Sequence, residues 1–145
     1  MKKINSRTKG AAFERLIVNK INDCFVDLNI DRRATRNLDQ AFIKGLADIY
    51  IGQFAIECKR YGVGSVWKQA WWDQVCHSAG DNLIPILIYK FNRRPIMAVV
   101  PGWTRSDSIK ICNKNIVQSP LEDICQDMPS FLDRCNRRFK FSEKL

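Results

Sequence analysis

Two acidic residues and a lysine are spaced in a way that suits chemistry on a phosphate. Asp48 lies in one apolar, β-rich run, and Glu57 and Lys59 lie in the next. Two neighbouring carboxylates repel each other unless a cation lies between them. Mg²⁺ is usually held by one or two carboxylates and keeps several waters, which leaves room for a phosphate oxygen and a nucleophile. An ammonium nearby can stabilise charge that develops on the phosphate. These residues therefore predict a Mg²⁺ site with a catalytic lysine beside it.

A β-hairpin is the element that must position these side chains. The runs 46–51 and 54–59 are separated by a Gly-Gln pair, and a Gly-X pair between two β-rich runs predicts a two-residue type II′ turn. In that register Asp48 faces Glu57 directly, and the Cβ atoms of such a pair lie about 4.5–5.5 Å apart. The predicted hairpin therefore brings the two carboxylates to one place.

Strand alternation divides the hairpin into a polar and an apolar face. The polar face carries Asp48, Tyr50, Glu57 and Lys59, and the backbone carbonyl of Cys58 is a further candidate metal ligand. The apolar face carries Ala47, Ile49, Ile51, Phe54, Ile56 and the Cys58 side chain. The alternative is that the two acids lie on a solvated sheet face, where Lys59 is an ordinary ion-pair partner.

A helix predicted over residues 10–25 adds a third acid. Its apolar positions recur at helical spacing, at Phe13, Leu16, Ile17, Val18, Ile21 and Cys24. Glu14 falls inside this apolar stripe, and a carboxylate that faces inward needs a partner because an unpaired buried charge is costly. Glu14 is therefore expected to have a partner in the interior. The alternative is an edge residue that reaches solvent.

The remaining chain predicts alternating helices and strands. Residues 66–79 form a predicted helix capped by Ser65, and residues 83–89 read as a strand buried on both faces. A turn over 92–94 leads to a strand over 96–100. Ser119 and Pro120 resemble a capping box that starts a helix, which Pro129 would break or kink. Residues 29–45 are predicted to form a loop or a short strand.

Composition favours one folded domain with a polyanionic partner. The chain has 145 residues, 46% of them hydrophobic, and its 24 Lys and Arg outnumber 15 Asp and Glu to give a net charge of +9. Such charge suits binding to a nucleic-acid backbone, although a solubilising surface is the alternative. The candidate phosphate contacts are Arg7, Lys9, Arg32, Arg33 and Arg36.

Membrane, export and disulfide chemistry are not expected. No apolar run approaches the length of a membrane span, and no secretory signal follows the basic N-terminus. The six cysteines include no C-x-x-C pair, so we expect reduced thiols without disulfide partners and no zinc site. These features predict a protein of the cytoplasm.

The pattern Asp48-(x)8-Glu57-x-Lys59 resembles the active-site motif of the PD-(D/E)xK nuclease superfamily, with Ala47-Asp48 in place of Pro-Asp. The predicted order of elements is also similar to that superfamily. The resemblance implies an α/β (α+β) fold with a restriction-endonuclease-like αβββαβ core over residues 6–100. In such a core a central mixed sheet is flanked by helices, and residues 101–145 would add a C-terminal helical extension to one nuclease domain of residues 1–145.

The segment from Ser6 to Gly10, followed by Glu14, is similar to the start of archaeal-type Holliday junction resolvases and their phage relatives. Those proteins also carry a glutamine on the helix after Glu-x-Lys; Gln69 and Gln74 are candidates here, and we choose Gln69 because it lies at the edge of the apolar stripe. The resemblance implies a Mg²⁺-dependent endonuclease, with Mn²⁺ able to substitute, that acts on branched DNA as a homodimer. Asp48 and Glu57 would hold the metal, with Glu14 contributing directly or through water. Gln69 would position a phosphate or a neighbouring group. The same resemblance implies that the cell is prokaryotic or a phage-infected host.

Two other functions remain open from the sequence. One keeps the chemistry and changes the substrate to duplex DNA, as in restriction-like, repair or exonucleolytic members of the superfamily. The other is a basic nucleic-acid-binding module without catalysis, which does not explain why two carboxylates should face each other across a hairpin.

Overall fold

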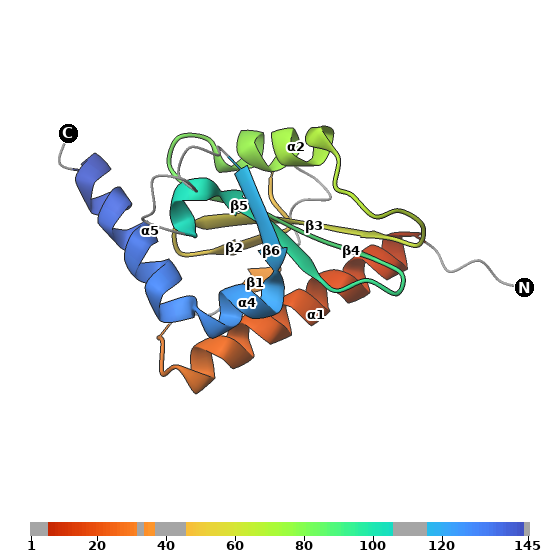
Figure 1. The fold of residues 1–145 in the computed structure, drawn as a ribbon, viewed down its shortest axis with the longest axis horizontal. Coiled ribbons are helices and arrows are strands. Elements are labelled where there is room, and N and C mark those ends of the chain that lie inside the picture. Colours follow the sequence, from red (N-terminus) through yellow and green to blue (C-terminus); the bar gives the residue numbers. More distant parts are fainter. Residues whose placement is uncertain (1–5, 32–33, 37–45, 106–115, 144–145) are drawn as a thin grey trace, which may run out of the picture.

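One mixed β-sheet organises the chain. A computed structural model describes residues 6–31, 34–36, 46–105 and 116–143, and its six strands follow the order β1-β2-β3-β4-β5-β6 across the sheet (Figure 1). The elements in chain order are α1 (Ser6–Asp27), β1 (Thr35–Arg36), β2 (Ile49–Ile51), β3 (Phe54–Tyr61), α2 (Gln69–Ala79), β4 (Ile84–Phe91), β5 (Met97–Pro101), η2 (Gly102–Thr104), β6 (Ile116–Pro120), α4 (Leu121–Gln126) and α5 (Met128–Glu143).

The sheet has the mixed topology that the sequence predicts. β3 and β4 are parallel, with α2 as the crossover between them, and every other neighbouring pair of strands is antiparallel. The first six elements therefore run α, β, β, β, α, β, which confirms the predicted αβββαβ order. The two helices α4 and α5 form the expected C-terminal extension.

Helices cover both faces of this sheet. α1, α4 and α5 pack on one face in the larger apolar core, to which Ile17 of α1, Ile56 of β3 and Phe131 of α5 all belong. α2 covers the opposite face through Trp71, Trp72 and Val75, and Figure 1 shows it on the other side of the sheet from α1. The side chains of β4 are buried on both faces, as the continuous apolar run 83–89 predicts.

The helix predicted over residues 10–25 is longer in the structure. α1 extends over Ser6–Asp27 and buries Phe13, Ile17, Ile21 and Phe25, which recur every four residues. Leu16, predicted to face inward, is 44% exposed. The stripe is therefore narrower than predicted and runs along the side of α1 that lies on the sheet.

Two elements differ from the prediction. α2 begins at Gln69 rather than at residue 66, because Lys68 has an extended backbone and takes the N-cap position that was assigned to Ser65. Residues 116–120 form β6, where a capping box was predicted; Ser119 pairs with Ala98 in the sheet, and its hydroxyl makes no cap. Pro120 lacks an N–H donor and is tolerated because it ends an edge strand.

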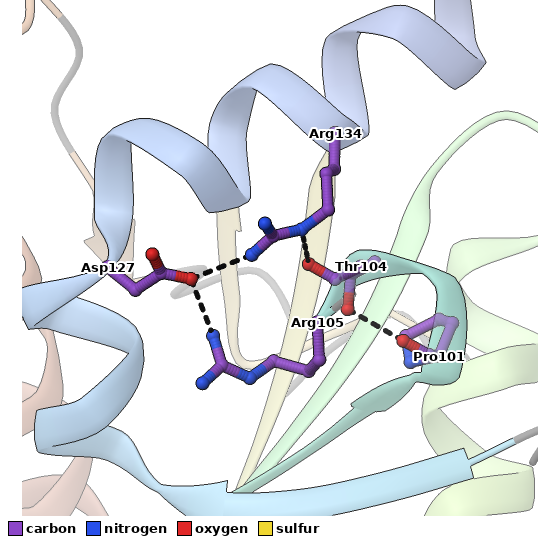
Figure 2. A network of polar contacts seen from close by, with 5 residues as sticks. All are labelled: Pro101, Thr104, Arg105, Asp127 and Arg134. Atoms are coloured by element: carbon purple, nitrogen blue, oxygen red, sulfur yellow. Dashed lines mark hydrogen bonds and ion pairs between the residues drawn. The ribbon is translucent and has the colours of Figure 1, made fainter. Parts of the chain in front are cut away.

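A network of ion pairs and hydrogen bonds joins the C-terminal helices to the segment that follows β5. Asp127, between α4 and α5, pairs with Arg134 at 2.7 Å and with Arg105 at 3.2 Å (Figure 2). Arg134 Nε also donates to the backbone carbonyl of Thr104 at 2.7 Å, and the Thr104 hydroxyl donates to the carbonyl of Pro101 at 2.6 Å. The helix break predicted at Pro129 falls two residues earlier, at Asp127.

Within the described ranges, no helix has the length and apolar character needed to cross a membrane. Cys24, Cys58, Cys76, Cys125 and Cys135 are free thiols.

Candidate active site

The β2–β3 hairpin has the predicted register. Ile51 pairs with Phe54, Tyr50 with Ala55 and Ile49 with Ile56. Gly52 has a φ of 50°, and a positive φ at the first turn position is what a two-residue hairpin of this kind requires. The turn chemistry therefore determines which residues of β3 lie opposite the chain that enters β2.

Asp48 lies just outside the strand ladder and is held by a backbone donor. β2 starts only at Ile49, and the amide of Cys58 donates to Asp48 Oδ2 at 2.8 Å. The direct ladder pair with Glu57 is therefore replaced by a side-chain contact across the end of β2. Alternation also fails here: Ala47 packs with Ala55 and Ala79 under α2, instead of on the face of Ile49 as predicted. The Ala47 amide donates to the Tyr50 hydroxyl at 2.9 Å, which holds this irregular stretch.

Glu57 is a buried carboxyl group, and one of its oxygens has no hydrogen-bond partner. Its side chain is 1% exposed, and Asp48 beside it is 6% exposed. The pKa of Glu57 is raised to about 8, first by burial and then by the charge of Asp48 and a hydrogen bond to that residue, against the opposing effect of Lys59. The oxygen without a partner is Glu57 Oε1. A buried oxygen without a donor is costly, and a cation is the group that would satisfy it and both carboxylates together.

Glu14 approaches the same place from α1. Its pKa is raised by burial and by the charge of Asp48, and Arg36 opposes this shift. Arg36 Nε lies 3.3 Å from Glu14 Oε1, with both side chains largely covered. Asn22 positions this strand, because its amide bonds both the N–H and the C=O of Ala34, at 2.7 and 3.2 Å. Glu14 therefore faces inward, with Arg36 as the partner that its position requires.

Lys59 and Cys58 lie on opposite faces of β3. Lys59 is two residues beyond Glu57, on the α2 face, and its charge acts on that carboxyl. The Cys58 side chain packs against the larger core, on the α1 face. Burial raises the pKa of the Cys58 thiol well above its ordinary value. The thiol is therefore neutral at physiological pH, and only the Cys58 backbone is available on the polar side.

The other predicted residues lie on α2, at the start of α1 or outside the described residues. Gln69 is exposed in the first turn of α2 and donates to Asp73 Oδ1 at 3.0 Å. Gln74 is also exposed on α2. Arg7 lies in the first turn of α1, and Lys9 is on the same helix near Gly62. Arg32 and Arg33 lie outside the described residues.

The carboxyl groups of Asp48 and Glu57 have the chemistry to hold a small divalent cation. Among the residues that the structure describes, no three His, Cys, Asp or Glu side chains converge to hold a metal ion. Asp48 and Glu57 offer two neighbouring carboxylates, and Mg²⁺ is commonly held by one or two carboxylates while it keeps waters on its other positions. The unpartnered Glu57 Oε1 fits this assignment.

The sequence did not reveal the contacts that three residues make around this site. Arg36 was predicted to contact phosphate, and the structure pairs it with Glu14. Asn22 and Tyr50 support the site through backbone hydrogen bonds. Asn22 is a polar residue next to the buried Ile21 of α1, and that position is the one signal in the sequence that could have pointed to it.

Comparison with known proteins places this geometry in a family. A family model described as "Phage putative PDDEXK endonuclease" matches residues 5–122. No curated protein matches the chain. Among solved structures, the Holliday junction resolvase Hjc of Archaeoglobus fulgidus is similar at a TM-score of 0.46 and 17% identity, over 77% of this chain and 86% of that chain. The family match spans α1, the hairpin with Asp48, Glu57 and Lys59, and the strands that follow. Because it covers most of the sequence, the chain belongs to the phage PD-(D/E)xK endonuclease family.

Proposed function

We propose that this protein is a divalent-metal-dependent endodeoxyribonuclease that hydrolyses phosphodiester bonds in branched DNA, with four-way junctions as its preferred substrate. The observation that carries the metal-dependent chemistry is Glu57 Oε1, buried without a hydrogen-bond partner beside the Asp48 carboxylate. The preference for junctions rests on the sequence of the N-terminal segment, where Lys9 and Gly10 precede Glu14.

Each residue of the site has a role in this proposal. Asp48 and Glu57 hold Mg²⁺, or Mn²⁺ in its place, with the Cys58 carbonyl as a further ligand and Glu14 acting directly or through water. When bound, the cation lowers the pKa of a coordinated water and neutralises charge on the phosphate. Lys59 orients the attacking water or stabilises the charge that develops on phosphorus. Gln69, at the start of α2, positions the phosphate from outside the carboxyl pair.

A homodimer completes the proposed activity. One chain offers one carboxyl pair among its described residues, whereas two symmetric nicks in a junction require two. A dimer with a twofold axis supplies both sites from identical chains. The net charge of +9 draws such a dimer to the DNA backbone through counterion release.

Cleavage of matched DNA substrates tests the proposal. We expect the protein with Mg²⁺ to nick a four-way junction faster than a flap or a linear duplex of the same sequence, and EDTA to stop cleavage. Asp48→Asn and Glu57→Gln should each abolish cleavage while DNA binding remains. Asp81→Asn, which changes an exposed acid beyond α2, is the matched control and should cut normally.

The other outcomes separate the remaining functions. Equal rates on junction and duplex would contradict the junction preference and favour a duplex nuclease of the same family. Normal cleavage by Asp48→Asn or Glu57→Gln would show the metal site to be wrong. Salt-sensitive DNA binding without hydrolysis under any divalent cation would make the protein a binding module.

A further inference from the structure

The loop between β3 and α2, residues 62–68, presents apolar side chains to solvent. Val63 is 96% exposed and Val66 is 65% exposed, which are the two largest exposures among the large apolar residues that the structure describes. Valine side chains in open water gain free energy when they are covered. Neither residue contributes to the packing of the sheet or of α2, so the fold does not explain them.

The backbone of this loop is held in place rather than loosely tethered. The carbonyl of Gly62 accepts the amide of Asn92 at 3.1 Å. Gly64 has a φ of 141°, and a Cβ there would lie 2.4 Å from the Phe91 ring, so only glycine fits. The exposed valines are therefore carried on a turn that packs tightly on the end of β4.

Aromatic side chains pack next to the two ends of this loop. The ring of Tyr61 is stacked on that of Trp71 with centroids 5.1 Å apart and planes 2° from parallel. Trp71 also contacts Tyr89 and Phe91, and Lys68 Nζ lies 6.0 Å from the Trp71 ring centroid. These contacts hold Tyr61 and Lys68, at the two ends of the loop, on the α2 face of the sheet.

The surroundings of the loop are basic. Figure 1 shows the start of α1, the loop from β3 to α2 and the turn from β4 to β5 at one end of the molecule. Lys9 Nζ lies 3.9 Å from the position of a Cβ on Gly62, and Arg60 donates to the Asn92 side chain at 2.8 Å. Arg93 and Arg94 are exposed in the turn. The sequence has no Asp or Glu between Glu57 and Asp73, or from residue 82 to residue 106.

We propose that Val63 and Val66 act as an apolar wedge that enters DNA at the branch point and unstacks a base step. Cations around an apolar tip match a phosphate backbone around a hydrophobic base stack, and apolar side chains inserted between base steps are a known means of kinking DNA. A branch point favours this entry because its bases are already less completely stacked. The inference rests on the proposed function, for which it names the element that selects the substrate.

The position of the loop limits where the cut falls. Val63 is four residues beyond Lys59 on the same chain, and an extended chain covers about 3.3 Å per residue, or roughly 13 Å in total. DNA rises about 3.4 Å per base pair. The scissile phosphate should therefore lie within about four nucleotides of the base step that the wedge opens.

Fluorescence of 2-aminopurine tests the wedge without requiring cleavage. The probe is a four-way junction with 2-aminopurine at the branch point, bound in EDTA, with a linear duplex of the same sequence for comparison. We expect fluorescence to rise when the wild type binds the junction, because unstacked 2-aminopurine is brighter. The variant Val63→Ser/Val66→Ser should bind without this rise. Val26→Ser, at the far end of α1 and 58% exposed in the wild type, is the control and should behave as the wild type.

Cleavage with Mg²⁺ gives the second readout. The ratio of junction to duplex cleavage should fall at least tenfold in the double variant, because half-burial of two valine side chains against bases already has about this effect. Wild-type cuts should map within about four nucleotides of the branch. A wild-type fluorescence rise and a wild-type ratio in the double variant would overturn the wedge. A different result would be that the wild type and Val26→Ser bind anionic lipid vesicles while the double variant does not. If the double variant also kept both wild-type DNA signals, this result would assign the loop to a membrane surface.

The two proposals fail in different ways. If the wild type cut no DNA with any divalent cation while the double variant still lost the fluorescence rise, the result would support the wedge and reject the nuclease. Metal-dependent junction cleavage that is indifferent to the valines would retain the nuclease and reject the wedge.

Discussion

At the scale of single residues, the buried carboxyl pair lowers the stability of the cation-free fold, and the proposed cation would restore that stability. Glu57 is nearly fully buried next to another carboxyl, and one of its oxygens has no donor. A polar atom in this state lowers the free energy of unfolding, since water would satisfy it in the unfolded chain. Folded proteins retain such groups at functional sites, where a ligand supplies the missing interaction.

Glu57→Gln should make the metal-free protein less sensitive to pH. The pKa of Glu57 is raised from 4.5 to about 8 in the folded chain, mainly by burial. The folded state therefore keeps a proton that the unfolded state has lost between these values, and stability present below pH 4.5 is lost as pH rises through 8. Glutamine does not ionise, so this loss should be absent from the variant.

Urea unfolding in EDTA at pH 5, 7 and 9 measures this difference. The variant should gain free energy of unfolding relative to wild type as pH rises, and Glu122→Gln, an exposed acid on α4, should not. The same fall in stability from pH 5 to pH 9 in Glu57→Gln and wild type would contradict the assignment of the raised pKa to this carboxyl.

Residue identity and spacing were enough to single out the polar centre. Glu57 and Lys59 share a strand face by alternation, and the Gly-Gln turn sets which residues lie across from them. The position of Asp48 outside the ladder was not predictable, because it depends on Ala47 leaving the strand to pack with Ala55 and Ala79. Pattern reasoning assumes that alternation holds over the whole predicted run of residues 46–51, but tertiary packing lets the strand begin only at Ile49.

At the scale of elements, the C-terminal helices are joined to the sheet by charge as well as by apolar packing. Asp127 accepts from two guanidinium groups, and one of these, Arg134, also bonds the carbonyl of Thr104. Ion pairs that are partly covered contribute more than exposed ones, because solvent screens them less. The network therefore stabilises the junction of η2 with α4 and α5.

Asp127→Ala should destabilise the fold by about 1–2 kcal/mol, since two charged donors lose their acceptor at a partly covered position. Asp133→Ala is the matched control: its ion pair with Arg137 has a similar length, 3.2 Å, but both side chains are more than half exposed. That variant should change stability by less than about 0.5 kcal/mol. Equal losses from the two variants in urea unfolding would show that the network adds nothing beyond an ordinary surface pair.

Elements with strong local signals were predictable and those that depend on partners were not. The apolar period of α1 and the continuous apolar run of β4 were sufficient. β6 was missed because Ser119 and Pro120 carry a local helix-start signal, while the free edge of β5, which the sequence does not display, pairs with them. The start of α2 was placed too early because residues 62–68 serve the loop instead of the helix.

At the scale of the whole molecule, the proposed action on four-way junctions requires a protein that matches the twofold symmetry of the junction. Light scattering should give a mass of about twice the 16.8 kDa of one chain. Dimers that combine one wild-type subunit with one Asp48→Asn subunit should nick one strand of each junction and leave the opposite strand intact, because each site serves one strand. Two nicks per junction from mixed dimers, or a monomeric mass for the active species, would contradict the paired-site proposal.

The amino-acid sequence by itself determined the family motif, the order of elements and the hairpin register, because these depend on periodicity and turn chemistry within a few residues. Tertiary structure alone decided that Glu14 pairs with Arg36 and that Glu57 keeps one oxygen without a partner. It also decided that the loop with the exposed Val63 and Val66 lies at the same end of the molecule as the start of α1 and the β4–β5 turn. Burial and charge at these points come from segments far apart in the chain, and only packing of the sheet between its helices brings them together.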